Sequence, residues 1–151
     1  MVQKAEQYCV ASEQCATSVR DKMVQWKVEK ELSDRIIEHL EFKNLINEER
    51  YVNYFCDSKL HQQHWGRTKI AYHLRLKQIP AEAIAAGIAA IDDEEYHQIL
   101  SRMVRLKREE FSHFDNPTRI DTKVIQSLSL RGFEPQEIRK ELEEQKNAEA
   151  N

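Results

Sequence analysis

The segment KIAYHLRLKQIPAEAIAAGI, residues 69–88, decides the fold because a similar segment, KVIQSLSLRGFEPQEIRKEL, follows at residues 123–142. At a constant offset of 54 residues (69 to 123), eight of the 20 aligned positions hold a pair of large apolar residues or a pair of basic residues. The apolar residues recur at helical spacing, as from Ile70 to Leu74. The longer step from Leu74 to Ile79 breaks that spacing, as a turn does. The repeated unit is therefore predicted to be a helix, a tight turn and a second helix.

A fainter copy of this pattern lies upstream, where Val19, Met23 and Val28 take the equivalent positions at an offset of 51 residues (19 to 70). Each copy is preceded by a further helix-like stretch, so the sequence predicts an all-α protein of three tandem three-helix repeats. These repeats cover approximately residues 4–45, 46–91 and 92–146. Because one such unit can bury only a small core, we expect the units to stack as an elongated, curved solenoid, with residues 1–151 forming a single domain.

The amino-acid composition favours the same helical class. Glycine and proline total six residues (3 + 3) of 151, fewer than strands joined by many tight turns need. The charged fraction of 32% suits long amphipathic helices. A net charge of -3 and a pI of about 6.1 exclude a uniformly basic nucleic-acid coat, because affinity for phosphate comes largely from cationic charge.

The cysteines and the apolar runs indicate the compartment. Cys9, Cys15 and Cys56 form no Cys-x-x-Cys pair, and their odd number is typical of free thiols in a reducing environment. The start of the chain shows no secretory signal. The longest apolar run, Ala83 to Ile91, has nine residues, well below the ~20 that a membrane span requires. We therefore expect a cytoplasmic protein without a membrane segment.

Polar residues, prolines and one glycine mark several expected helix ends. Ser12 and Asn47 are each followed by glutamate and are predicted N-caps. The pair Asn116 and Pro117 is typical of a cap followed by the first helical residue. Gly132 is predicted to end a helix in the left-handed conformation.

No motif for catalysis is evident. The chain lacks a nucleophile elbow, a phosphate-binding glycine-rich loop and a His-Glu-x-x-His metal motif. His61 and His64 are spaced as His-x-x-His near Cys56, a set that could bind zinc. Solvent-facing histidines beside a half-buried cysteine explain the pattern better. We therefore expect no enzyme activity, no cofactor and no metal site.

Two groups of basic residues stand out against the acidic total charge. The segment from Ser58 to Ala81 contains no Asp or Glu and has a formal charge of +5. Its cations are Lys59, Arg67, Lys69, Arg75 and Lys77. The second group is Arg102, Arg105, Lys107 and Arg108, spaced to line one side of a long helix. These residues predict either a solvated helix face or a surface for an anionic partner, such as DNA phosphate or an acidic protein groove.

Aromatic residues are interleaved with the first basic group. Trp65 and Tyr72 lie within the segment from Ser58 to Ala81. Trp65 fits an interface between helical units as well as it fits stacking on a nucleotide base.

Together, these residues resemble the RecX regulatory proteins over nearly the whole chain. The central unit carries the resemblance through Arg50, Tyr51, Phe55, Lys59, Gly66, Arg67, Lys69, Ile70, Leu74 and Ile79. The third unit agrees through Lys123, Leu128, Arg131, Gly132, Phe133 and Ile138. The first unit agrees more loosely through Cys9, Ser12, Val19, Lys22 and Met23. The family usually has glycine at the turn before the second repeated helix, where this chain has Lys27 in unit one and Gln78 in unit two.

The resemblance implies a regulator that binds the RecA recombinase filament in its groove and restrains strand exchange and coprotease activity in the SOS response. On this hypothesis the monomeric protein would contact the filament through its basic groups, with single-stranded DNA as a weaker partner. The contact residues would be Lys59, Arg67, Lys69, Arg75, Lys77, Arg102, Arg105 and Arg108. The second hypothesis is a DNA- or RNA-binding module that acts alone, which the net charge of -3 disfavours. The third is an enzyme with zinc at His61 and His64.

Overall fold

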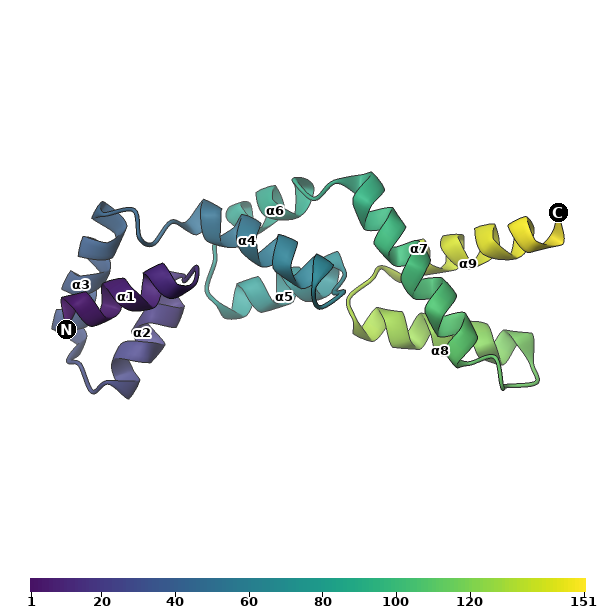
Figure 1. The fold of residues 1–151 in the computed structure, drawn as a ribbon, viewed down its shortest axis with the longest axis horizontal. Coiled ribbons are helices and arrows are strands. Elements are labelled where there is room, and N and C mark those ends of the chain that lie inside the picture. The colour runs from purple at the N-terminus through teal and green to yellow at the C-terminus, as the bar shows by residue number, and fades with distance from the viewer.

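The computed structural model describes residues 1–151 and contains nine α-helices and no strands. The helices are α1 (Val2–Ala11), α2 (Ala16–Gln25), α3 (Lys30–Phe42), α4 (Glu48–His61), α5 (Arg67–Leu76), α6 (Ala81–Ala89), α7 (Asp93–Glu110), α8 (Pro117–Leu130) and α9 (Pro135–Ala150). Successive groups of three helices follow one another along the long axis of the molecule (Figure 1). The predicted all-α fold of three-helix repeats is therefore confirmed. None of the helices combines the length and apolar character needed to cross a membrane.

The repeated apolar positions form the core, as the periodicity predicts. Ile70 and Leu74 in unit two, and Val124 and Leu128 in unit three, are 0% exposed. A cluster of 19 buried residues extends through units two and three, whereas a separate cluster of eight belongs to unit one. Units two and three thus share one hydrophobic core, which Cys15 of unit one also joins, and the rest of the unit-one core forms a separate cluster together with Ile46.

Most of the predicted helix ends are confirmed. The Asn47 side chain accepts a hydrogen bond from the backbone N–H of Arg50 at 2.9 Å. Asn116 caps α8 in the same way, with Pro117 as the first helical residue. The prediction for Ser12 is wrong: Ser12 follows the last residue of α1 in an extended conformation, and α2 begins only at Ala16. The residues between Ala11 and Ala16 connect α1 to α2, so a capping sequence at Ser12 does not by itself determine where α2 begins.

The same left-handed turn joins the second and third helices of every unit. Lys27, Gln78 and Gly132 occupy it with φ of 59°, 60° and 94°. In unit two, the N–H of Ile79 bonds to the carbonyl of Leu74 at 3.2 Å, and equivalent bonds close the other two turns. This pattern satisfies carbonyls left free at a helix C-terminus. The two residues that replace glycine therefore adopt the conformation that glycine tolerates best.

Backbone contact joins units two and three. The N–H of Gly66 donates to the carbonyl of Arg131 at 2.8 Å, and the N–H of Thr68 donates to the carbonyl of Gly132 at 3.0 Å. A Cβ atom at Gly66 would lie 2.3 Å from the backbone nitrogen of Phe133, so no larger residue fits. The junction consequently holds the start of α5 against the turn that precedes α9.

Candidate partner-binding surface

Two lysines of the first basic group lie around the ring of Trp65. Lys59 Nζ on α4 is 4.8 Å from the ring centre, and Lys69 Nζ on α5 is 4.5 Å from it. Phe55 and His73 also pack against the ring, with centroids 6.3 and 4.5 Å away. Trp65 is thus engaged within unit two by α4 and α5, and it holds two ammonium groups by cation–π attraction. Trp65 is also partly buried against the large hydrophobic cluster that extends through units two and three.

Exposed residues continue this cluster along α5. Tyr72 is 52% exposed and meets the edge of the His73 ring at 5.4 Å. Arg75 stands one turn further along α5 and is also exposed, next to the exposed Leu76. Burial and the nearby charges of Lys69 and Lys59 lower the pKa of His73. The exposed part of α5 therefore combines positive charge with aromatic and aliphatic surface.

A cleft of about 400 Å³ lies beside this cluster, between units one and two. Lys59 and Lys77 of the predicted group line it, together with Lys22 from α2. Tyr54, which is 49% exposed, contributes an aromatic side chain from α4. The cleft brings basic residues from two units together, although acidic residues also contribute to its walls.

We refer to Lys59, Lys69, Arg75 and Lys77 as the central basic surface. None of these four side chains forms an ion pair within the chain. Their charges are thus available to an anionic group, and the aromatic residues between them offer contact area to a protein or a nucleotide.

Arg67 does not join this surface. Its guanidinium pairs with Asp93 at 2.8 Å and with Glu134 at 3.2 Å, and lies 3.8 Å above the ring of Tyr96. The Tyr96 hydroxyl donates to Glu134 and accepts from the backbone N–H of Arg67. Arg67 is therefore a structural residue at the junction of units two and three, and its charge is already compensated.

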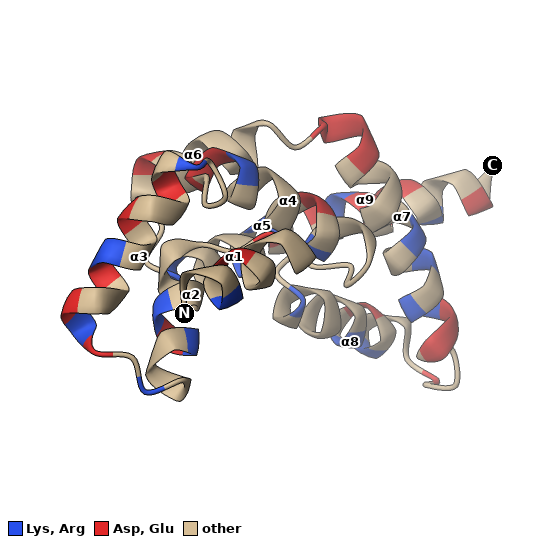
Figure 2. Ribbon diagram, turned by 60° about the vertical axis from the view of Figure 1, so that its left-hand side comes forward, with Lys and Arg blue, Asp and Glu red and all other residues tan.

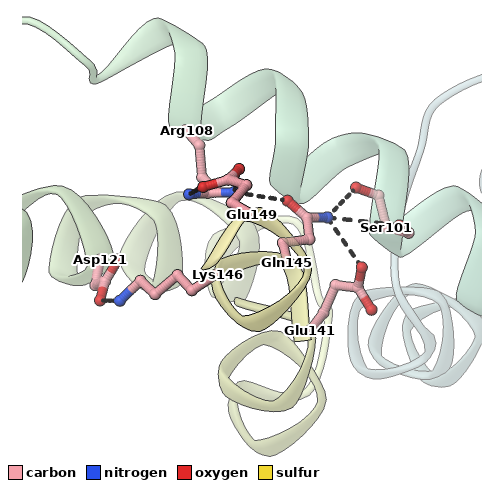
Figure 3. A network of polar contacts seen from close by, with 7 residues as sticks. All are labelled: Ser101, Arg108, Asp121, Glu141, Gln145, Lys146 and Glu149. Carbon is pink, nitrogen blue, oxygen red and sulfur yellow. Dashed lines mark hydrogen bonds and ion pairs between the residues drawn. The ribbon is translucent and has the colours of Figure 1, made fainter. Parts of the chain in front are cut away.

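The second basic group also contains both unpaired cations and cations in ion pairs. Arg102 and Arg105 on α7 are exposed and form no ion pair. Arg108 instead pairs with Glu149 of α9 through two hydrogen bonds of 2.7 and 2.9 Å (Figure 3). Lys107 pairs with Glu110 and is only 18% exposed. Two cations of this group, Arg102 and Arg105, are therefore free of ion pairs, whereas the other two are paired within the chain.

The charge distribution along α7 separates the two groups of free cations. Figure 2 shows a basic band in the middle of this helix and acidic bands at both of its ends. Asp93, Glu94 and Glu95 form the acidic first turn. The six unpaired cations of the two predicted groups are thus the four of the central basic surface and the pair Arg102 and Arg105.

The structure does not gather His61, His64 and Cys56 into a metal site. His61 binds the carbonyl of Asp57 at 2.9 Å and the carboxylate of Glu95 at 2.5 Å. Cys56 is buried, and this burial raises the pKa of its thiol to about 11. The three side chains are absent from the one His/Cys/Asp/Glu cluster with metal-binding spacing, which lies elsewhere in the chain.

Sequence reasoning missed the contribution of unit one to the cleft. Lys22 lies 5.6 Å above the ring of Tyr8, and both residues line the cleft beside Lys59. The repeat alignment could have indicated Lys22, since at an offset of 51 (22 to 73) it corresponds to His73, the residue stacked on Trp65.

Comparison with known proteins identifies similar chains. Residues 47–88 match the family model described as RecX, second three-helix domain. The chain is 26% identical over 121 residues to the regulatory protein RecX of Clostridium perfringens strain 13, covering 77% of this chain and 54% of the relative. A second relative, from C. perfringens strain SM101, gives 26% identity over 120 residues. The chain thus spans about half the length of the curated relatives it matches.

Solved structures show the same fold. A crystal structure of RecX from Lactobacillus salivarius superposes with a TM-score of 0.81 at 20% identity, covering 95% of this chain and 92% of the other. A crystal structure of a regulatory protein RecX gives 0.83 at 18% identity, covering 94% and 73%. The arrangement of nine helices is therefore shared with these proteins.

Proposed function

We propose that the chain is a member of the RecX family and acts as a non-enzymatic regulator of the RecA recombinase. In this proposal it binds RecA filaments on single-stranded DNA and inhibits strand exchange and coprotease activity. The protein would thereby modulate recombination, DNA repair and the SOS response. The cytoplasm, where such filaments form, would be its place of action, and a monomer would be the acting form.

One observation supports the proposal most strongly: the segment that matches the family model also holds the central basic surface. Residues 47–88 include all four of its cations and the aromatic residues between them. A filament of protein on DNA offers both phosphate and acidic side chains, which unpaired lysines and arginines attract. Arg102 and Arg105 supply a second contact from unit three.

The role of Arg67 and Arg108 differs from that of the other six predicted cations. Both guanidinium groups are engaged by carboxylates within the chain. Releasing either arginine to a partner would leave those carboxylates unpaired. We therefore propose that both residues act by holding the units together, and that filament contact is made by the six free cations.

The test is inhibition of the DNA-dependent ATPase of RecA by the triple variant Lys59→Glu, Lys69→Glu and Arg75→Glu. We expect this variant to lose inhibition while keeping its helical content. The matched control reverses the same number of exposed, unpaired charges elsewhere. Its substitutions are Lys30→Glu, Arg139→Glu and Lys140→Glu. The proposal is wrong if the first variant inhibits fully, or if the control loses inhibition to the same degree.

A nucleic-acid-binding module acting without a recombinase is the alternative. It predicts tight binding of the protein alone to DNA, with affinity falling steeply as salt rises, by about 0.7 to 0.9 log units per log unit of salt for each phosphate neutralised. The contact of Trp65 with His73 argues against it, because the His73 ring lies 4.5 Å from the indole ring and competes with a base for that ring. Direct binding titrations at two salt concentrations distinguish the two functions.

A further inference from the structure

Glu141 on α9 is an unusual residue because its carboxylate is buried without full hydrogen bonding. The residue is 4% exposed. Its Oε1 atom accepts a hydrogen bond from Gln145 at 2.9 Å, whereas Oε2 is shielded from solvent and has no hydrogen-bond partner. Figure 3 shows the second oxygen pointing away from the polar network around Gln145. A buried carboxylate oxygen without a hydrogen bond is costly, and a cation bound to it would offset that cost.

Two further ligand groups face this oxygen. His97 Nε2 on α7 lies 3.3 Å from Glu141 Oε2, close enough for an ion pair but without hydrogen-bond geometry. Glu144 contributes another carboxylate from the next turn of α9. One donor atom from each of the three residues lies within 4.8 Å of the other two. No other set of three or more His, Cys, Asp or Glu residues in the chain has this spacing.

The separation of the His97 nitrogen and the Glu141 oxygen fits two ligands of one tetrahedral metal ion. Zinc bonds of about 2.0–2.2 Å to nitrogen and oxygen, at the tetrahedral angle, place two ligand atoms about 3.3–3.5 Å apart. The distance between His97 and Glu141 already has this value. Glu144 is exposed and has rotamer freedom, so its carboxylate can approach to complete a third bond.

Unit one provides an internal comparison for this arrangement. There, His39 on α3 pairs with Glu6 on α1 at 2.7 Å and forms a hydrogen bond. His39 and Glu141 are equivalent in the repeat alignment, since Ile36 and Ile138 both stand three residues before them. Unit one thus shows an ordinary His–Glu contact between the first and third helices, whereas unit three has a wider pair and an added carboxylate.

We propose that His97, Glu141 and Glu144 bind one divalent transition-metal ion of the zinc class, which links α7 to α9. A neutral imidazole and two carboxylates would balance the charge of the ion. Gln145 would orient Glu141 as an outer-shell partner, because its amide also donates to the Ser101 carbonyl at 2.9 Å. His97 is 51% exposed, which leaves a side open for a water ligand and for entry of the metal.

The experiment titrates Zn²⁺ into the full chain, freed of metal by a chelator, in competition with a chromogenic zinc indicator. We expect one zinc ion per chain and a zinc-dependent rise in melting temperature, since a ligand that binds only the folded state stabilises it. Mg²⁺ at the same concentration should produce neither effect. Equal responses to Mg²⁺ and Zn²⁺ would indicate only a general acidic cluster and would overturn the proposal.

Variants identify the site independently of folding. We expect His97→Ala and Glu144→Gln to weaken zinc affinity tenfold or more, and both positions are exposed, so the fold should be retained. The matched controls are His39→Ala, which removes the paired histidine of unit one, and His61→Ala, which removes the histidine near Cys56. The proposal fails if wild type binds no zinc, or if the controls lose as much affinity as His97→Ala and Glu144→Gln.

Discussion

Replacing Gln78 with glycine is expected to stabilise the protein, although glycine usually destabilises a folded chain. Gln78 has a φ of 60° in the turn between α5 and α6. The left-handed conformation costs a residue with a side chain about 1–2 kcal/mol. Glycine avoids that cost but gives the unfolded chain more freedom, which offsets about 0.5–1 kcal/mol. The difference predicts a net stabilisation of about 0.5–1 kcal/mol for Gln78→Gly.

The opposite sign is expected for Gly132→Ala at the equivalent turn of unit three. A Cβ atom on Gly132 would lie 2.3 Å from the Cβ of Lys69 and 2.5 Å from its backbone nitrogen. The junction would have to open, at a cost of about 1–3 kcal/mol for overpacking. Left-handed strain on alanine, with φ at 94° in the present structure, brings the expected loss to about 2–4 kcal/mol.

Thermal unfolding followed by circular dichroism measures both effects. For a chain of this size, 1 kcal/mol shifts the melting temperature by about 2–4 °C. We expect Gln78→Gly to melt about 1–4 °C higher than wild type and Gly132→Ala to melt several degrees lower. The control Gln78→Ala keeps the strained backbone and should bring no gain. A lower melting temperature for Gln78→Gly, or an unchanged one for Gly132→Ala, would refute the turn geometry described above.

Three further predictions concern the core, the junction and pH. Leu74→Ala should cost about 2–5 kcal/mol in a urea denaturation experiment because Leu74 is 0% exposed, and a negligible loss would contradict the helix phase. Arg67→Ala should lower the free energy of unfolding by about 1–3 kcal/mol because its two ion pairs are lost. In a binding assay at low temperature, the same variant should bind filaments as well as wild type does. The bond from His61 to the Asp57 carbonyl and the nearby Glu95 carboxylate raise the pKa of His61, so its charged form stabilises the fold. That contribution is present below the unfolded-state pKa of about 6.5 and is lost as pH rises through the folded-state pKa, so His61→Gln should destabilise more at pH ~5.5 than at pH ~8.5. An equal effect at both pH values would show that the pair carries no charge-dependent stability.

The sequence predicts the helical repeat well because the repeat is a local property. Ile70 and Leu74 recur at helical spacing, and burial of that face follows directly. The caps at Asn47 and Asn116 are also local, since each involves atoms within three residues. Ser12 is a residue type that caps helices, but it does not stand directly before α2. The length of the connection between two packed helices determines where the next helix starts.

The candidate binding surface is harder to predict because the pairing of charges depends on distant residues. Arg67 and Lys69 are neighbours in the basic segment, yet only Arg67 meets carboxylates from α7 and from the turn before α9. The approach of α9 to α7 likewise engages Arg108 and leaves Arg105 free. Spacing along one helix cannot reveal such partners. The contact between His97 and Glu141 escaped sequence analysis for the same reason.

Co-sedimentation with RecA filaments tests whether the central basic surface binds the filament. Three samples are centrifuged in parallel at physiological salt. They contain the wild-type chain with filaments, the triple variant at Lys59, Lys69 and Arg75 with filaments, and the wild-type chain with bare single-stranded DNA. We expect that wild type pellets with filaments, that far less of it pellets with bare DNA, and that the variant stays in the supernatant. Pelleting of the variant with filaments, or equal pelleting of wild type with bare DNA, would contradict this expectation.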